Sequence, residues 1–195
     1  NELACQPDGD LCDNCHEKWD GNYELLEMHH GYIQWFFPVF ENAGMNFESK
    51  PLSKTGAALI RASPECGERV LRSYKVMLRF YGLDLADERT GQLKRDADPE
   101  ARLDNLNCSP HNWLRVSRIL TSLGELGFRR FKRPLLDHLQ KEIEDGALAN
   151  AAQSYARFWL PLVDQEGTEH YNAKTREEDA DREDGALFKA GGRLA

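Results

Sequence analysis

The chain has 195 residues and a mass of 22.3 kDa, a size that suits one compact core and excludes two independent ones. Its formal net charge of −8 opposes non-specific binding to nucleic acid, which is therefore not an expected partner. The longest apolar run, residues 32–40, is far shorter than the roughly 20 residues that cross a bilayer, so we expect no transmembrane segment. Five cysteines are too few for a disulfide scaffold, and most are expected to be thiols.

The pattern along the chain divides it into three segments. Residues 1–16 contain Pro and Gly without apolar periodicity, and they are predicted to form an irregular N-terminal arm. Residues 17–163 carry helical periodicity and form the predicted domain, whereas residues 164–195 form an extended acidic tail that we expect to lie on a partner surface. The predicted fold class is all-α (mainly α): an irregular helical bundle with long loops. Because the sequence begins with Asn1 rather than Met, the displayed start is expected to be internal.

The first predicted helices are short. Asn22 is expected to cap one of them, and Gly31 suits the left-handed residue that ends it. The aromatic segment 32–38 follows and is expected to be buried. Residues 41–52 are predicted to form a loop, after which Ser53 caps a second short helix.

Serine followed by proline marks the start of each of the two longest predicted helices. Serine caps the free amides at a helix start, and proline at the first helical position loses no hydrogen bond. One helix runs from Ser63 to Gly82, and a second begins at Ser109 and loosens near Gly124.

The remaining segments alternate between turns and amphipathic helices. Residues 83–98 are polar and predict a turn-rich loop, after which Asp98 and Pro99 open a short helix. A further helix is predicted from Phe131 to Gly146. The apolar face of the last predicted helix consists of Leu148, Ala152, Tyr155, Phe158 and Leu162.

Cys12, Cys15 and His16 match the Cys-x-x-Cys-His pattern by which two thioethers attach a haem while the histidine binds its iron. Zinc is a second interpretation, because the two thiolates and a histidine supply three of four tetrahedral ligands. Candidates for the remaining ligand are Cys5, His29 and His30. A redox-active cysteine pair is a third interpretation. We favour unliganded thiols as the state of these cysteines. Apart from the haem and zinc alternatives, we expect no cofactor.

The segment 129–133 concentrates positive charge, and Arg115 and Arg118 precede it on the adjacent predicted helix. Such a cluster can bind phosphates, but a solvated helix start that pairs with acidic residues is the favoured interpretation. The sequence contains no Gly-x-Ser-x-Gly elbow, glycine-rich phosphate loop or His-Glu-x-x-His pattern. We therefore expect that the chain is not an enzyme.

Several blocks of sequence resemble the opioid growth factor receptor conserved-region family, over about residues 17–139. They are EKWDGNYELLEMHHGYIQWFFP at 17–38, GMNFESKPL at 44–52, YKVMLRFYG at 74–82 and NLNCSPHNWLRVSRILTSLGELG at 105–127. The resemblance implies binding of an opioid growth peptide and growth regulation. It also implies nuclear or perinuclear residence, as in the vertebrate members, while an organellar location stays open.

We therefore expect a non-enzymatic protein- or peptide-binding or scaffold domain that makes its contacts through an aromatic surface. One alternative is a structural subunit of a larger multiprotein complex, organellar or membrane-associated, that assembles through residues 164–195. Another is a zinc or haem carrier that uses Cys12, Cys15 and His16.

The candidate binding residues are aromatic and polar members of the resembling blocks. They are Trp19, Asn22, Tyr23, His30, Tyr32, Gln34, Trp35, Asn46, Asn107, His111, Asn112, Arg115 and Arg118. For the polar members, the alternatives are a buried hydrogen-bond network and a binding groove.

Overall fold

The computed structural model describes residues 9–40 and 49–164, and within them it is mainly helical, as predicted. The elements are α1 (Cys12–Trp19), α2 (Tyr23–Met28), α3 (Ile33–Phe36), α4 (Lys54–Ala62), α5 (Pro64–Phe80), β1 (Leu83–Leu85), β2 (Leu93–Arg95), α6 (Glu100–Cys108), α7 (Pro110–Glu125), η1 (Arg129–Phe131), α8 (Lys132–Glu144), η2 (Ala149–Ala151), α9 (Ala152–Ser154), η3 (Tyr155–Trp159) and α10 (Leu160–Asp164). The expectations for Asn46, for most of the loop 41–52 and for the tail 165–195 lie outside the described residues.

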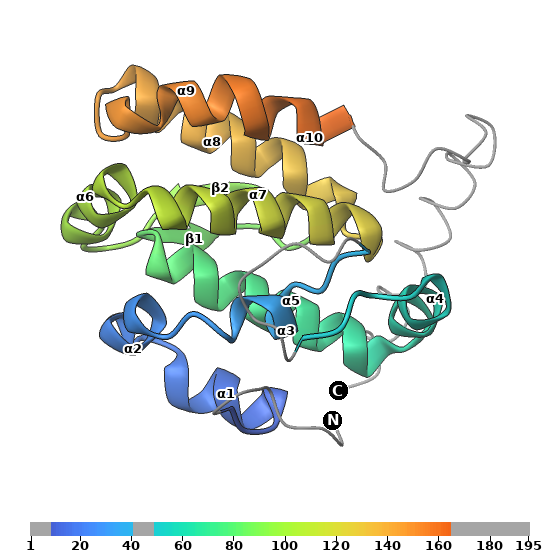
Figure 1. Cartoon of the computed structure of the whole chain (residues 1–195). Coiled ribbons are helices and arrows are strands. Elements are labelled where there is room, and N and C mark those ends of the chain that lie inside the picture. Colours follow the sequence, from blue (N-terminus) through green and yellow to red (C-terminus); the bar gives the residue numbers. More distant parts are fainter. Residues whose placement is uncertain (1–8, 41–48, 165–195) are drawn as a thin grey trace.

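Helices α5 and α7 form the centre of the molecule. In Figure 1, α7 crosses the middle, with α8, α9 and α10 on one side and α5 on the other; β2 is drawn level with α7, and β1 lies between β2 and α5. The helices α1 and α2 lie beyond α5, and α1 and α4 both pack against it. The core between these layers contains fully buried aromatic and aliphatic side chains, among them Tyr74, Met77, Leu120 and Phe131.

The predicted starts of three helices are confirmed by side-chain caps. The Asn22 side chain accepts a hydrogen bond from the Leu25 amide, and Ser53 accepts one from the Gly56 amide. Ser63 caps α5 by the same geometry. Such caps satisfy amides that the first turn of a helix leaves without a partner, and each contributes about 1 kcal/mol.

The irregular arm predicted for residues 1–16 is wrong at its end, because α1 begins at Cys12. Cys15 and His16 are buried, with 0% and 2% exposure. His16 Nε2 lies 2.7 Å from Ser73 Oγ on α5, and Asp13 accepts hydrogen bonds from Arg69. Cys15 and Trp19 bury the apolar side of α1, and the polar contacts with α5 add to them; this side spans only two turns, which explains why periodicity missed the helix.

The loop predicted for residues 83–98 contains a two-stranded antiparallel sheet, in which β1 pairs with β2. Asp87 shapes the turn between them by accepting hydrogen bonds from the Arg89 and Thr90 amides. Gly91 has φ of +77°, and a Cβ atom there would lie 2.8 Å from the Arg130 carbonyl oxygen. The hairpin therefore packs closely on η1, an approach that only glycine permits.

The helix predicted across 148–162 is interrupted. A π-helical turn, η3, covers Tyr155–Trp159 and shifts the positions that face the core. Trp159 is fully buried and its indole N–H donates to the Trp113 carbonyl oxygen over 3.1 Å, whereas Phe158 is 56% exposed. The prediction that Phe158 belongs to the apolar face was therefore wrong.

Two predicted helix signals act differently in the structure. Helix α2 ends at Met28 before Gly31, and Gly31 does not adopt the left-handed conformation. Ser109 makes no side-chain cap on α7; its hydroxyl donates to Asn105 Oδ1 over 3.0 Å. Within the described residues, none of the helices is both long enough and apolar enough to cross a bilayer.

Candidate functional site

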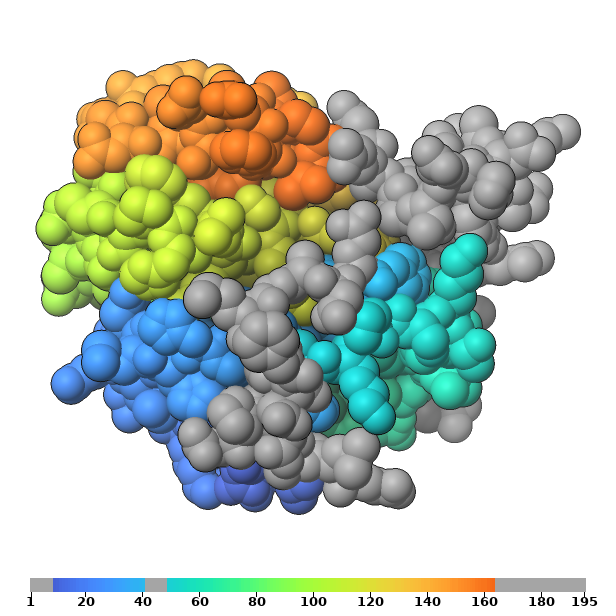
Figure 2. All heavy atoms as spheres, in the orientation of Figure 1, coloured from blue at the N-terminus to red at the C-terminus, as the bar shows by residue number. Residues whose placement is uncertain are grey.

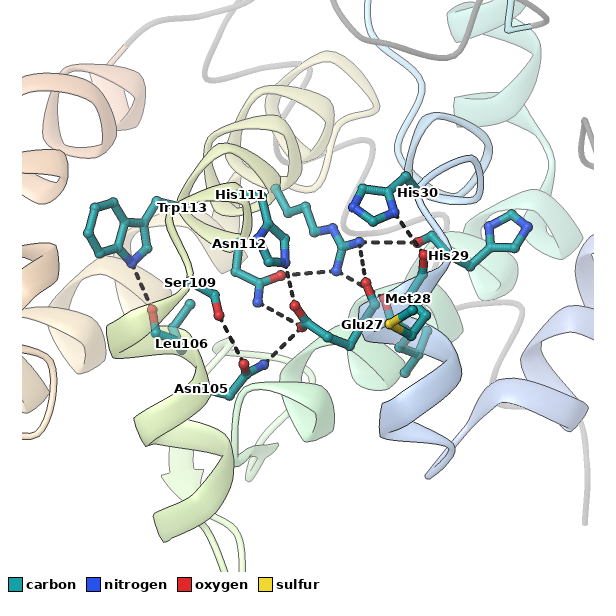
Figure 3. Close-up of polar contacts among 12 residues, drawn as sticks. Glu27, Met28, His29, His30, Asn105, Leu106, Ser109, His111, Asn112 and Trp113 are labelled. Atoms are coloured by element: carbon teal, nitrogen blue, oxygen red, sulfur yellow. Dashed lines mark hydrogen bonds and ion pairs between the residues drawn. The ribbon is translucent and has the colours of Figure 1, made fainter.

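The C-terminal end of α2 meets the first half of α7 in a cluster of polar side chains (Figure 3). Arg115 is only 5% exposed. It donates hydrogen bonds to the carbonyl oxygens of Leu26 and His29 over 3.0 and 3.1 Å, and a longer one of 3.4 Å to the backbone carbonyl oxygen of Glu27. The last carbonyls of a helix have no partner within it, and the helix dipole favours a cation beside them. Arg115, which belongs to α7, thus caps the C-terminal end of α2.

The carboxylate of Glu27 joins this cluster to α6 and α7. Its Oε2 accepts hydrogen bonds from Asn105 and Asn112 over 2.9 and 3.1 Å. His111 Nε2 lies 2.5 Å from its Oε1. The amide oxygen of Asn112 in turn accepts from Arg115, so the two charged groups belong to one continuous network (Figure 3).

Glu27 is expected to be ionised at neutral pH. Burial, the largest single influence, raises its pKa, but the hydrogen bonds from Asn105 and Asn112 and the charges of His111 and Arg115 together outweigh burial. The net effect is a pKa below the ordinary value for a glutamate. The network therefore contains a fixed negative charge next to the buried Arg115.

The outer side of the network is an exposed surface of mixed character. The rings of His30 and His111 lie 5.9 Å apart, and His30 Nδ1 donates to the Met28 carbonyl oxygen over 2.8 Å. Met28 is 72% exposed and Leu114, one helical turn after His111, is 73% exposed. We call Met28, His30, His111 and Leu114 the histidine surface.

The structure brings five of the predicted binding residues together at the end of α2: His30, Tyr32, His111, Asn112 and Arg115. The Tyr32 hydroxyl donates to the Leu26 carbonyl oxygen over 3.1 Å, the same atom that accepts from Arg115. A hydrogen-bond network was one of the two alternatives for the polar members, and it is the one that these residues form.

Other predicted polar residues lie elsewhere. Asn22 caps the opposite end of α2, and Asn107 accepts a hydrogen bond from the Asn150 amide over 2.9 Å. Arg118 donates to the Phe37 carbonyl oxygen over 2.8 Å. Gln34 is buried in α3. These side chains connect separate parts of the fold and do not line one groove.

The predicted aromatic surface is wrong for two of its members. Trp19 and Tyr32 are buried, at 7% and 0% exposure, and their rings meet edge to face. Tyr23 and Trp35 are half-buried. Tyr23 packs below the guanidinium of Arg102, whose Nη1 donates to the tyrosine hydroxyl over 2.7 Å. Trp19 and Tyr32 therefore support the core.

The positive cluster of Arg115 and Arg118 with residues 129–133 does not form. Arg115 and Arg118 point at the carbonyl oxygens of α2 and of Phe37, as described above. Arg130 lies over the Phe131 ring, 4.5 Å from its centre, and donates to the Glu88 carbonyl oxygen. The basic residues thus serve separate contacts.

The Cys-x-x-Cys-His segment occupies α1, where its side chains have other partners. Cys12 Sγ lies 3.7 Å from His16 Nε2, the atom that also contacts Ser73. Burial, and next the charge of Asp13, raises the pKa of the Cys12 thiol to about 11. Across residues 9–40 and 49–164, no three His, Cys, Asp or Glu side chains converge as a metal site would require; Cys5 is outside this range.

The sequence did not single out Glu27, Met28 or Leu114. Glu27 sits among other charged and polar residues of a short helix, where an acid is ordinarily a solvated surface group. Its role depends on Asn105, Asn112 and His111, which lie some 80 positions along the chain. A single sequence carries no signal for that convergence.

Comparison with known proteins identifies relatives of the chain. The family model described as the opioid growth factor receptor (OGFr) conserved region matches residues 1–176. The opioid growth factor receptor of Mus musculus is 40% identical over 84% of this chain and 26% of its own length. The human receptor is 42% identical over 73% of this chain and 21% of its own. Opioid growth factor receptor-like protein 1 of Mus musculus is 39% identical over 84% of this chain and 35% of its own length. No solved structure matches the chain significantly.

Proposed function

Because the chain belongs to the opioid growth factor receptor family, we propose that it is a non-enzymatic protein- or peptide-binding domain whose contact face is the histidine surface. The observation that carries the proposal is the exposure of Met28 and Leu114, each of which lies within three positions of one of the paired histidines. Apolar side chains that gather in one exposed patch mark contact surfaces on other proteins. Apolar anchors surrounded by polar groups are typical of contact surfaces.

The rigid base beneath this surface also supports a binding role. The ends of α2 and α7 are joined by Arg115 and Glu27, so His30 and His111 are held in place before any ligand arrives. A preorganised surface loses less conformational entropy on binding. The two imidazoles provide hydrogen-bonding groups next to the apolar side chains, and a peptide can use both.

The names of the relatives suggest the class of ligand. Several relatives are called opioid growth factor receptors, and the chain spans about a quarter of the length of those receptors. We propose that the shared part contains the peptide-binding surface. In this proposal the residues beyond the shared part of the relatives are not needed for the first contact with the peptide.

The proposal is tested by isothermal titration calorimetry of the 195-residue chain with opioid growth factor peptide. We expect saturable binding to the unaltered chain. The double variant Met28→Ser, Leu114→Ser removes both apolar contacts and should weaken binding at least about tenfold, or about 1.4 kcal/mol.

Leu59→Ser is the matched control. Leu59 is 67% exposed, as Met28 and Leu114 are, but it lies on α4 outside the histidine surface. This control should bind as tightly as the unaltered chain. Absence of saturable binding to the unaltered chain, or equal weakening by the control, contradicts the proposal.

A further inference from the structure

A groove with a volume of about 900 Å³ runs between β2 and α8, on a part of the molecule that the histidine surface does not include. The β2 side contributes Leu93, Lys94 and Arg95, and α8 contributes Pro134 and Lys141, among others. In Figure 1, β2 lies between β1 and α8, so this groove borders the edge of β2 that β1 does not occupy.

The backbone of β2 points hydrogen-bonding groups toward that free edge. The Ala86 amide donates to the Gln92 carbonyl oxygen over 2.8 Å, and the Asp96 amide donates to the Gly82 carbonyl oxygen over 2.9 Å. In an antiparallel pair the bonded positions alternate, so Lys94 is the β2 residue that bonds to β1.

Leu93 and Arg95 consequently direct their N–H and C=O groups away from β1. No partner for these four groups occurs within the described parts of the chain, 9–40 and 49–164. An edge of this kind can accept an additional strand from another molecule.

The edge is rigid because both sides of the groove are fixed. Arg95 makes a two-point ion pair with Glu142, whose side chain is only 2% exposed on α8. At the turn, Gly91 packs against η1, and Arg130 donates to the Glu88 carbonyl oxygen. A fixed edge lowers the entropic cost of adding a strand.

The charges along the groove favour an acidic partner. Lys94 and Lys141 are exposed and form no ion pair within the described residues, whereas Asp137 pairs with Arg133 and Glu142 pairs with Arg95. Asp145 is the remaining carboxylate of the groove. The groove is lined by Lys94, Arg95 and Lys141 and by Asp137, Glu142 and Asp145, and once the ion pairs of Glu142 and Asp137 are set aside, the two lysines exceed Asp145 by one charge.

We propose that this groove binds an extended, acidic peptide segment of a partner protein, which adds to β2 as a third strand. Its backbone pairs with Leu93 and Arg95, and its carboxylates contact Lys94 and Lys141. The proposal is independent of the peptide-binding role of the histidine surface, because the two sites share no residue.

Hydrogen exchange measured by NMR tests the proposal directly. The probe is the synthetic peptide acetyl-Thr-Val-Glu-Val-Thr-Glu-Val-amide, whose two glutamates point to opposite faces of an added strand, and it is added to the ¹⁵N-labelled full chain. We expect exchange of the Leu93 and Arg95 amides to slow at least about tenfold, because protection of an amide follows its hydrogen bonding. The Lys94 amide, which already bonds to β1, should change little. The same peptide with N-methyl groups on alternate amides should not produce the slowing.

A charge variant separates this site from non-specific association. Lys94→Glu combined with Lys141→Glu alters only exposed side chains and should weaken the probe at least about threefold, since it replaces attraction with repulsion. Lys54→Glu on α4 makes the same type of change away from the groove and should have no effect. The proposal is overturned if millimolar probe leaves exchange at Leu93 and Arg95 unchanged, or if the N-methylated peptide slows it equally.

Discussion

Arg115 donates a 3.0 Å hydrogen bond to the carbonyl oxygen of Leu26, a residue that precedes it by 89 positions. This contact makes the end of α2 depend on α7. It also places Glu27, which follows Leu26, and His111, which lies one helical turn before Arg115, within an ion-pair distance of each other. The histidine surface therefore exists only when α2 and α7 are docked.

Replacing Arg115 with Met should remove about 3 kcal/mol from the free energy of unfolding. The side-chain length is nearly kept, but the hydrogen bonds from the guanidinium to the carbonyl oxygens of Leu26, Glu27 and His29 are lost, and hydrogen bonds to a charged group contribute about 1.5–3 kcal/mol. Urea unfolding at pH 7 measures the change. Arg133→Met, at an exposed ion pair with Asp137, should change the same quantity by less than about 0.5 kcal/mol. Equal effects of the two variants would contradict the capping role.

Acid should destabilise the chain partly through His16. Burial, and next the charge of Arg72, lowers its pKa from 6.5 to about 4, so the folded protein binds fewer protons than the unfolded chain between these values. The contribution to stability is therefore complete above pH 6.5 and declines as the pH falls toward 4.

His16→Gln should flatten this decline, because the variant lacks the buried imidazole. Urea unfolding at a series of pH values gives the slope for each protein. An unaltered slope in the His16 variant would show that His16 is not buried in its neutral form.

Gly91→Ala should destabilise the chain more than Gly146→Ala. Both glycines have positive φ, which costs an alanine about 1–2 kcal/mol. A Cβ at Gly91 would in addition meet the Arg130 carbonyl oxygen and the Phe131 ring, whereas a Cβ at Gly146 meets nothing within 4 Å. The difference between their thermal unfolding midpoints isolates the clash. Similar midpoints would mean that the hairpin does not pack on η1.

Alkylation should distinguish the cysteines by position. Cys108 is exposed, whereas Cys15 is fully buried and the Cys12 thiol has a pKa of about 11. Because the thiolate is the reactive form, iodoacetamide at pH 7.5 should modify Cys108 first and Cys12 and Cys15 much more slowly. Peptide mass mapping over time provides the order. Rapid modification of Cys12 would contradict the raised pKa of its thiol.

Much of the helical fold was predictable because its signals are local. Asn22, Ser53 and Ser63 cap helices by accepting hydrogen bonds from amides only three positions ahead, and such chemistry is visible in sequence. The left-handed Gly82 after α5 is equally local. The π-helical turn at 155–159 and the three-residue strands depend instead on tertiary contacts, such as the indole of Trp159 with α7.

The site was predictable only in part. His30, His111, Asn112 and Arg115 were selected through a family resemblance, and the structure places them together. Their shared partner Glu27 was missed, because its three partners come from distant positions. Phosphate binding by Arg115 and metal or haem binding by the Cys-x-x-Cys-His segment were alternatives in the sequence analysis, and the structure shows that Arg115, Cys15 and His16 are buried.

The proposed binding face lies where α2 and α7 meet at the surface of the molecule. In Figure 2 the blue surface that contains α2 borders the yellow-green surface that contains α7. A ligand on that face would contact the two helices together. Binding should thus report on the docking of α2 against α7 as well as on the peptide.

The most direct test of this account is a chemical-shift map of the ¹⁵N-labelled chain during titration with opioid growth factor peptide. The account predicts that the largest, saturable shifts occur at the amides of Met28, His30, His111 and Leu114. Shifts that concentrate on another face, or no saturable shifts at millimolar peptide, would contradict it.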